Sequence, residues 1–410
     1  MKVLLLGADG FIGRHIAFYL REQGVEVTCL ARNPARLARM GFATVMADLT
    51  HDATHAPAFW QPHLPPGTHL INAAGLLTGT SANFEAVHSL APQAALQALD
   101  PQARALLISA VGVTAETPFA LWRRQTEALF ARHTILRPGL VLGDTSYGGS
   151  SMLRALAAFP IRIPVVGGGQ QRFNPMHARD LAAVVLECLR TPPGAGPWDV
   201  GGPEIVTQTR LVQLYRRWLG LPAARLLHLP LAVAVALAGL GDLFRLGPIS
   251  TTALRQLEHG VLSDPAPLLR KIATRPRGAV AFITARPAGT QDLWQARLYL
   301  LKPLIRLSLA LMWLGLGAVA LLLPAADLTT NVTSGLTRAA GLIDIALAAA
   351  LLRDIAPKPT ALAQLVFVLA TTLILTLLAP ALWADPLGGL MKNLALLPLI
   401  LTHIALIEER

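Results

Sequence analysis

A glycine-rich loop near the amino terminus has the residue types and spacing that bind a phosphate group. It reads Gly7-Ala8-Asp9-Gly10-Phe11-Ile12-Gly13, directly after a short apolar run and before a helical pattern that begins near Arg14. Glycines at this spacing let the backbone approach a pyrophosphate, whose charge then meets the N–H groups at the helix start. The sequence therefore predicts a dinucleotide site here. The residues expected to contact the nucleotide are Gly7, Asp9, Gly10, Phe11, Ile12 and Gly13.

Two arginines follow the second predicted strand, at the place where NAD-binding proteins position a carboxylate for the ribose hydroxyls. The segment reads Ala31-Arg32-Asn33-Pro34-Ala35-Arg36. Guanidinium groups bind phosphate oxygens through charge-assisted hydrogen bonds, so Arg32 and Arg36 favour NADP(H) over NAD(H). The alternative is that both arginines are solvated side chains on a loop.

Residues after the third and fourth predicted strands extend the expected cofactor site. Asp48 and Leu49 follow the third strand, where a side chain is placed to contact adenine. The segment Asn72-Ala73-Ala74-Gly75 follows the fourth strand and puts small residues where a dinucleotide crosses the sheet edge. We therefore expect Asp48, Leu49, Ala73, Ala74 and Gly75 to contact the cofactor.

The elements that position these residues are predicted by an alternation of short β-type runs with helical runs over residues 1–220. This alternation indicates an α/β fold of the Rossmann type, with a doubly wound parallel sheet covered by helices. The six expected strands are Val3–Leu6, Val25–Leu30, Thr44–Met46, His69–Asn72, Ala105–Ser109 and Ile135–Leu136. Neighbouring parallel strands end at one edge of the sheet, so the motifs that follow them are expected to lie together.

The last quarter of the chain carries four apolar stretches of about the length that crosses a bilayer core. They are Leu304–Leu323, Gly335–Leu352, Leu362–Trp383 and Leu387–Ile407. The connections before the first stretch and after the second contain Lys and Arg, whereas residues 324–334 contain neither. By the positive-inside rule we expect a multi-pass protein of the cytoplasmic (inner) membrane, with the soluble part and both termini in the cytoplasm.

A fifth apolar stretch, between Arg225 and Phe244, is too short to span a bilayer comfortably. We expect a helix that lies at the membrane surface or docks on the transmembrane part; a helix buried in the core is the alternative. The expected domains are therefore 1–224, which binds NAD(P), 225–302, an amphipathic membrane-proximal connector, and 303–410, an all-α domain with four spans.

Within the membrane domain, the carboxylate of Asp344 falls in the second apolar stretch. Intramembrane carboxylates are costly and usually face a partner or a cavity. Asp344 and Lys392 lie at similar depths if both stretches enter from the same side. We therefore expect Asp344 to point into the helix bundle and to pair with Lys392 or Arg338.

Composition agrees with a membrane protein and excludes other classes. Of the 410 residues 53% are apolar and only 14% are charged, which excludes disorder and argues against a purely soluble protein. The charges of residues 303–410 balance, so the net charge of +11 lies in residues 1–302 and favours anionic lipid headgroups. Nucleic acid is not an expected partner, because the basic residues are scattered and no aromatic-rich motif accompanies them.

Cysteine and histidine residues predict no metal site or disulfide framework. Cys29 and Cys188 are the only cysteines, and neither lies in a spacing typical of metal ligands. The histidines at 51, 55, 63 and 69 lie in a stretch rich in Pro and Ala and show no helical pattern. Reduced cysteines fit a cytoplasmic location for the soluble part.

Together these motifs resemble the extended and atypical short-chain dehydrogenase/reductase (SDR) superfamily. The resemblance includes the glycine loop, Asp48, residues 72–75, Arg137-Pro138-Gly139, residues 172–180 and Gly201-Gly202-Pro203. It is strongest to the group that contains the dehydrogenase-like accessory subunit of respiratory complex I. Residues from about 300 onward resemble a DoxX-type four-helix membrane domain. The resemblance implies an NAD(P)-binding oxidoreductase fold, with Ser109, Arg123 and Pro138 as further cofactor contacts.

The sequence departs from this superfamily at its catalytic pair. Active members use Tyr-x-x-x-Lys on the helix after the fifth strand, where Tyr transfers a proton and Lys lowers its pKa. Here Phe119 stands at the Tyr position and Arg123 at the Lys position. Phenylalanine has no proton to give, and arginine holds its proton too tightly to exchange it. Two candidate catalytic residues remain. Ser109 ends the fifth strand, and Tyr147 lies in the loop after the sixth strand.

Two functions are therefore open. The first is a membrane-anchored NADP(H)-binding protein whose nucleotide is structural or regulatory, within a membrane protein complex near quinone or respiratory chemistry. The second is a true NADPH-dependent oxidoreductase, epimerase or isomerase that acts on a lipid-like substrate, since hydride transfer needs only a placed nicotinamide and an acceptor. A transporter of a small redox compound is a third, weaker interpretation.

Overall fold

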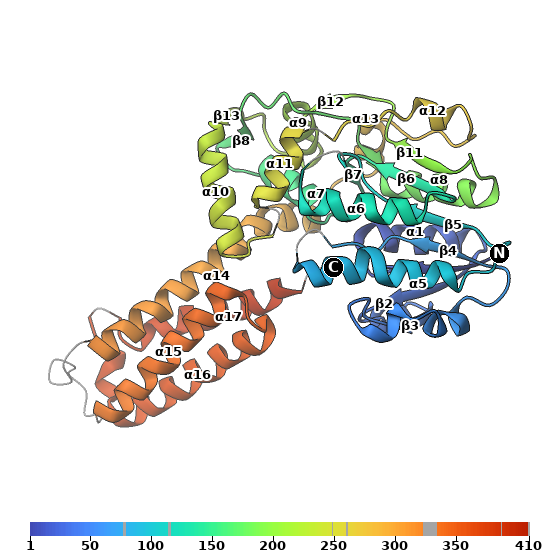
Figure 1. The fold of residues 1–410 in the computed structure, drawn as a ribbon. Coiled ribbons are helices and arrows are strands. Elements are labelled where there is room, and N and C mark those ends of the chain that lie inside the picture. The colour runs from blue at the N-terminus through green and yellow to red at the C-terminus, as the bar shows by residue number, and fades with distance from the viewer. Residues whose placement is uncertain are drawn as a thin grey trace. The chain divides into compact units, whose positions relative to one another are not determined.

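The computed structural model describes residues 1–76, 79–113, 116–247, 249–259, 261–322, 334–386 and 388–408 (Figure 1). It divides into two compact units. The first, called the α/β unit below, comprises Met1–Ala234 and Thr252–Thr290. The second, called the helical unit, comprises Val235–Thr251 and Gln291–Arg410. Residues 225–302 are thus shared between the two units.

The α/β unit is built on a seven-stranded parallel sheet with the order β11-β6-β5-β4-β1-β2-β3. Its strands are β1 (Lys2–Leu6), β2 (Glu26–Ala31), β3 (Ala43–Met46), β4 (Thr68–Asn72), β5 (Ala105–Ile108), β6 (Thr134–Pro138) and β11 (Gly196–Val200). The order reverses between β1 and β4, and ligands of such sheets bind at the carboxyl ends of the strands beside this reversal. The predicted doubly wound fold is confirmed.

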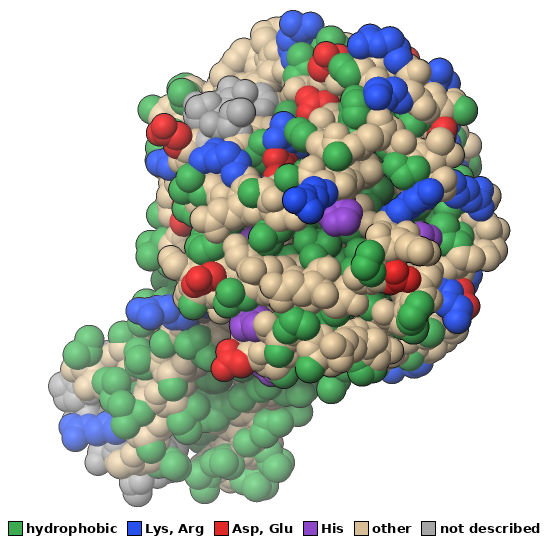
Figure 2. All heavy atoms as spheres, turned by 45° about the vertical axis from the view of Figure 1, so that its right-hand side comes forward, with side chains coloured by type: hydrophobic (Ala, Val, Ile, Leu, Met, Phe, Trp, Pro, Cys, Tyr) green, Lys and Arg blue, Asp and Glu red, His purple; other side chains and the backbone are tan. Residues whose placement is uncertain are grey.

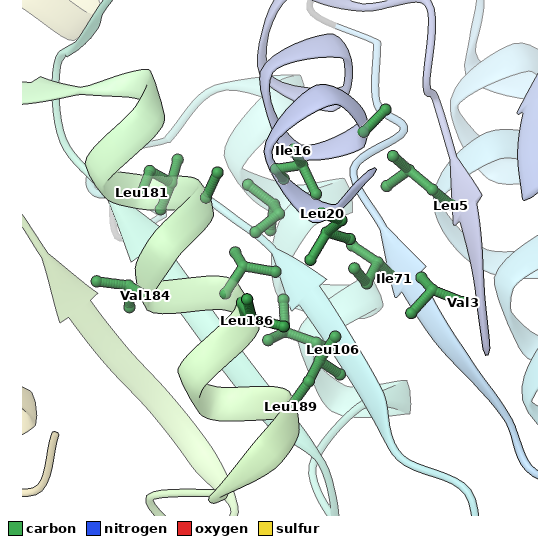
Figure 3. Close-up of a cluster of buried hydrophobic side chains, with 14 of the residues drawn as sticks. Val3, Leu5, Ile16, Leu20, Ile71, Leu106, Leu181, Val184, Leu186 and Leu189 are labelled. Carbon is green, nitrogen blue, oxygen red and sulfur yellow. The ribbon is translucent and has the colours of Figure 1, made fainter. Parts of the chain in front are cut away.

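Two hydrophobic cores cover the two faces of the sheet, because successive residues of a strand point to opposite sides. Val3 and Leu5 of β1 face the helices α1 (Phe11–Glu22) and α8 (Ala178–Arg190), which lie side by side on one face (Figure 3). Leu4 and Leu6 face the opposite core, which contains the fully buried Trp60. These apolar layers fix the strand ends that carry the glycine loop.

Further short elements complete the α/β unit. Three two-stranded sheets pair β10 with β7, β12 with β9 and β13 with β8. Their strands are β7 (Val141–Leu142), β8 (Arg162–Val166), β9 (Arg172–Phe173), β10 (Met176–His177), β12 (Val206–Thr207) and β13 (Arg225–Leu229). The remaining helices before α14 are α2 (Ala35–Arg39), α3 (Pro57–Trp60), α4 (Ser81–Glu85), α5 (Ala91–Gln97), α6 (Pro118–Leu129), α7 (Gly149–Ala157), α9 (Gln208–Trp218), α10 (Leu231–Leu243), α11 (Thr251–His259), α12 (Ala266–Leu269) and α13 (Ala279–Ile283).

The helical unit packs four helices around one apolar core, and hydrophobic side chains cover much of its surface (Figure 2). The helices are α14 (Thr290–Leu322), α15 (Ser334–Arg353), α16 (Pro357–Leu378) and α17 (Met391–Ile407). All four contribute to the core, which includes Leu309, Trp313, Leu351, Val368 and Ile400. The helices α14 and α15 approach closely at Gly317, where an added Cβ would overlap the backbone of Gly341. Small residues at such crossings are typical of helix packing in membranes.

Among the described residues, three helices are long and apolar enough to cross a membrane, namely α14, α15 from Gly335, and α16. The fourth predicted span corresponds to α17, which has only 17 residues and so a length of about 26 Å. The third predicted span, Leu362–Trp383, was placed five residues too far toward the carboxyl terminus, since α16 runs from Pro357 to Leu378. Its helix ends at Leu378, because Pro380 begins a separate 3₁₀ turn.

The predicted pairing of Asp344 is wrong. Its side chain is buried in the helical unit, but its Oδ1 atom has no hydrogen-bond partner. Among the described residues no ion pair joins it to Arg338 or Lys392, both of which are exposed. Long basic side chains near helix ends extend toward polar surroundings, which keeps their charges away from the bundle interior.

Candidate nucleotide-binding site

The glycine loop lies where β1, β4 and the start of α1 converge. Gly7 has a φ of +71°, and a Cβ at this position would overlap the backbone of Ala74. A Cβ on Gly13 would overlap the carbonyl of Gly7, so the helix can pack this close to the loop only with glycine there. The amide of Gly10 donates to the carbonyl of Gly7 over 3.1 Å and closes the turn.

The helix that follows begins at Phe11, three residues before the start expected near Arg14. Gly10 is its N-cap and has no side chain to accept from the first amides. The first N–H groups of a helix have no partner within the helix, so those of Phe11, Ile12 and Gly13 are available to a negative group. The loop can therefore hold a pyrophosphate, as the sequence predicted.

Basic side chains gather beside this loop. Arg14 follows Gly13 in α1 and is half-buried near Arg36, and burial together with the charge of Arg36 lowers the pKa of Arg14. The Nε atom of Arg36 is buried without a hydrogen-bond partner in the described part of the chain. Two neighbouring cations with an unsatisfied donor fit an added phosphate group. The sequence analysis missed Arg14, although its position directly after the third glycine places it on the first turn of the helix.

Asp48 is held as an ionised acceptor after β3. Its carboxylate accepts hydrogen bonds from the amide of Thr50 at 3.0 Å and from its hydroxyl at 2.8 Å. These bonds, and the nearby charge of Arg32, lower the pKa of Asp48. Leu49, the next residue, is buried. Arg32 is exposed, which leaves its guanidinium accessible to a ligand.

The end of β5 carries a buried hydrogen-bonded group of three side chains. The hydroxyl of Ser109 donates to Glu127 over 2.6 Å. Arg137, on β6, donates to the same carboxylate from Nε at 2.8 Å and from Nη2 at 2.5 Å. Ser109 is 4% exposed and Glu127 is 8% exposed. The single hydroxyl proton of Ser109 is therefore donated to Glu127 and is not available to a ligand.

Arg123 and Phe119 lie together on α6, at the positions of the family's catalytic pair. The guanidinium of Arg123 lies 5.5 Å from the Phe119 ring centroid, and its Nη1 donates to the carbonyl of Ile108 over 3.2 Å. Burial lowers the pKa of Arg123 to about 10, which leaves it protonated at neutral pH. A Cβ on Gly75 would overlap this guanidinium, so the charge lies against the loop after β4.

His88 is a buried neighbour of this region that the sequence analysis did not identify. Its Nε2 accepts from the amide of Leu76 over 3.1 Å, which places the ring proton on Nδ1, 3.4 Å from the Thr126 hydroxyl. Burial, and then the charge of Arg123, lower the pKa of His88 to about 3. The ring is therefore neutral and its acceptor nitrogen is occupied, so His88 supports the loop after β4 rather than exchanging protons.

Tyr147, the second candidate proton donor, lies in the loop before α7. Its side chain is 55% exposed and lies within electrostatic range of Arg14. No hydrogen bond joins Tyr147 to Ser109 among the described residues. The structure thus places Tyr147 in an exposed loop before α7, and Ser109 in a hydrogen bond with Glu127 at the end of β5.

A second polar cluster that the sequence analysis missed includes Asp144, in the loop after β7. Asp144 accepts from Nε of Arg286 over 3.3 Å and lies 3.8 Å from Nε2 of His177. These residues line a pocket with room for about one water molecule. Next to them, His15 of α1 and the Thr145 hydroxyl form a 3.1 Å hydrogen bond. Burial, and then nearby positive groups, lower the pKa of His15 to about 4.

This fold and glycine loop define a dinucleotide-binding α/β protein joined to an apolar helical unit. Residues 3–96 match the NAD dependent epimerase/dehydratase family, and residues 309–401 match the DoxX-like family. The chain therefore combines an NAD(P)-binding, SDR-like domain with a DoxX-like membrane domain, and it is a membrane protein. The predicted resemblance to both families is confirmed.

A curated relative matches a little more than half of the chain. It is the mitochondrial NADH dehydrogenase [ubiquinone] 1 alpha subcomplex subunit 9 of Arabidopsis thaliana, 26% identical over 260 residues. The match spans 58% of this chain and 62% of that relative. It agrees with the predicted resemblance to the accessory subunit of complex I.

Two solved structures share the fold of the α/β unit. The human epimerase family protein SDR39U1 (isoform 2), determined with NADPH, is 20% identical and superposes with a TM-score of 0.52 over 70% of this chain and 98% of that one. An SDR superfamily protein from Agrobacterium tumefaciens, determined with bound NAD, is 16% identical. It superposes with the same TM-score of 0.52 over 74% of this chain and 99% of that one. Structural neighbours thus include proteins with either nucleotide.

Proposed function

We propose that this chain is a membrane-anchored NADP(H)-binding protein in which the nucleotide is structural or regulatory. One observation carries the proposal: Phe119 occupies the place of the family's proton donor, and the neighbouring hydroxyl of Ser109 donates its proton to Glu127. Neither group can protonate a substrate in this arrangement. A nucleotide bound here would lie against the positive charge of Arg123, with no proton donor at Phe119 or Ser109.

The residues around the loop fit the proposed cofactor. The free amides of Phe11 and Ile12 would receive the pyrophosphate, and Asp48 with Leu49 would contact the adenosine part. Arg14, Arg32 and Arg36 would bind a 2′-phosphate, for which the buried Nε of Arg36 supplies an unsatisfied donor. This is why NADP(H) is preferred to NAD(H) in the proposal.

The nicotinamide end would be held by the remaining predicted contacts. Ala73, Ala74 and Gly75 leave room for the backbone of the dinucleotide, and Pro138 ends the strand beside Ser109. Arg123 would bind a ribose hydroxyl or a phosphate oxygen as a fixed cation. A bound NADPH supplies a hydride, but Arg123 stays protonated and cannot take part in proton exchange.

The proposed setting is a respiratory or quinone-linked membrane complex. It rests on the likeness to a subunit whose name places it in NADH dehydrogenase [ubiquinone], and on the DoxX-like membrane domain. The soluble part and both termini are proposed to lie in the cytoplasm, because connections rich in Lys and Arg usually lie on the cytoplasmic side of a membrane.

The alternative is an NADPH-dependent oxidoreductase, epimerase or isomerase with a lipid-like substrate. Its candidate proton donor is Tyr147, because this phenol is 55% exposed and is therefore accessible to a ligand. In this alternative Tyr147 would donate the proton that Phe119 cannot supply.

Purification in mild detergent, followed by mass spectrometry of the copurifying nucleotide, lipid and protein, tests the proposal. We expect NADP(H) in nearly stoichiometric amount, together with membrane proteins of a larger complex. Recovery of NAD(H) alone would contradict the assigned 2′-phosphate site. Recovery of a stoichiometric lipid-derived product without any partner protein would favour the alternative.

A further inference from the structure

The helix α10 presents an apolar surface that the described residues leave exposed. From Leu231 to Gly241 it contains no charged or polar side chain. Six large apolar side chains of α10 are between 44% and 66% exposed, namely Leu231, Val233, Val235, Leu237, Leu240 and Leu243. Only the small side chains of Ala234 and Ala238 and the backbone of Gly241 are buried. The predicted alternative of a helix buried in the core is therefore wrong.

The exposed positions are spread around the helix. At 100° per residue, the six large side chains cover about two thirds of its circumference, and the two buried alanines lie in the remaining sector. A helix that lies flat on a membrane has a charged face toward water, whereas the single charged side chain of α10 is Asp242, in its last turn. A contiguous apolar surface of this kind marks contact with a membrane or a protein.

Contacts within the helical unit tie the end of α10 to the ends of the membrane helices. The carbonyl of Phe244 accepts from Arg306 of α14, and Arg245 donates to the carbonyl of Arg353 over 3.1 Å. Arg353 is the last residue of α15, and the adjacent Asp354 pairs with Arg306 at 2.9 Å. These charged groups lie where α15 ends, and the end of a helix that spans a membrane is where headgroups are expected.

The length and flanks of α10 indicate how it meets the lipid. Thirteen residues rise about 20 Å, less than the roughly 30 Å of the hydrocarbon core, so the helix cannot cross it. Exposed arginines stand on both sides of the apolar stretch, at Arg225 and Arg245. Basic residues that flank an uncharged apolar segment are attracted to anionic headgroups, whereas a protein partner needs no such flanks.

We propose that α10 inserts its apolar surface into the bilayer on the side where α15 ends, without crossing to the other side. The occupant of this surface is lipid. Inserted in this way, α10 is a membrane contact in addition to the helices of the DoxX-like domain, and it lies at the point where the α/β unit continues into the helical unit.

Site-directed spin labelling of the full chain in lipid vesicles tests this. Cys29 and Cys188, both buried, are replaced by Ala, and a nitroxide is attached at L237C or, as a second position, L240C. Leu121 of α6, 51% exposed in the α/β unit, is the aqueous control, and Leu373 of α16, 63% exposed, is the lipid control. The accessibility of the nitroxide is then measured to two relaxation agents: oxygen, which partitions into lipid, and a water-soluble nickel chelate.

We expect the ratio of oxygen to nickel accessibility at both α10 positions to exceed that at 121 several-fold and to approach that at 373. A nickel-dominated pattern, as at 121, would show that the helix faces water. Shielding from both reagents would show that protein, including a second copy of this chain, covers it. Either of these results overturns the proposal.

Discussion

The hydroxyl of Ser109 lies 2.6 Å from the carboxylate of Glu127, which Arg137 holds through two further hydrogen bonds. The resemblance to the SDR superfamily implies that Ser109 stands at the position of that family's helper hydroxyl. Here the hydroxyl donates to a buried carboxylate, and the tyrosine position is Phe119. Both departures remove proton donors from the same end of the site.

Glu127→Gln should destabilise the α/β unit. It removes the negative partner of a mostly buried ion pair and leaves the Arg137 charge uncompensated. We expect a loss of about 2 kcal/mol, less than the 3–5 kcal/mol typical of a fully buried pair, because the Arg137 side chain is 25% exposed. Thermal unfolding in detergent measures the change, with exposed Glu26→Gln as the control. Equal stability of both variants would show that the pair is not structural.

Stability should fall as the pH falls below about 6.5, in part because of His88. Burial holds its folded pKa at about 3, whereas an unfolded histidine titrates near 6.5. Between these values the unfolded chain binds a proton that the folded chain does not, so the stability present above pH 6.5 is lost on acidification. The slope from His88 is about 1.4 kcal/mol per pH unit. His88→Gln should reduce the slope by this amount, and the exposed His51→Gln should leave it unchanged. An unchanged slope in His88→Gln would refute the assignment.

Arg32→Ala and Arg14→Gln should each weaken NADPH much more than NADH, because only NADPH carries the 2′-phosphate. A charge-assisted contact of this kind contributes about 1.5–3 kcal/mol, or roughly 10- to 150-fold in Kd. Titration by nicotinamide fluorescence gives both affinities. Arg39→Ala, at the exposed end of α2, is the matched control. If both nucleotides lose affinity equally, the arginines do not recognise the phosphate.

Reporter fusions test the topology. Fusions within residues 324–333 and after Asp354 should report opposite compartments, since α15 separates them. A fusion after Glu408 should report the same compartment as Asp354 only if the short helix α17 crosses. The opposite result at 408 would mean three spans, with the carboxyl terminus on the non-cytoplasmic side.

Local patterns in the sequence were enough to predict the glycine loop, six of the seven strands of the main sheet and both family resemblances. The glycine loop and the strands depend on residues that are neighbours in the sequence, namely three spaced glycines and short apolar runs. The strand β11 was missed because Gly196-Pro197-Trp198-Asp199-Val200 contains residues that disfavour strands, and pairing with β6 overrides this preference.

Contacts between distant residues could not be predicted in the same way. Ser109, Glu127 and Arg137 come from β5, α6 and β6, and only the folded sheet brings them together. Asp344 shows the same limit: its depth in the membrane followed from helical rise, but its partner depends on how each helix is rotated. The predicted ion pair failed because Lys392 and Arg338 are exposed.

The most direct test of the central claim follows the absorbance of NADPH in the presence of the detergent-purified full chain. A panel of quinones, carbonyl compounds and membrane-extracted lipids serves as acceptors. We predict bound NADPH without consumption beyond a slow background, because losing a positioned acid costs about 10²–10⁴ in rate. Turnover above roughly 1 s⁻¹ that Tyr147→Phe or Ser109→Ala abolishes would contradict the account and establish a reductase.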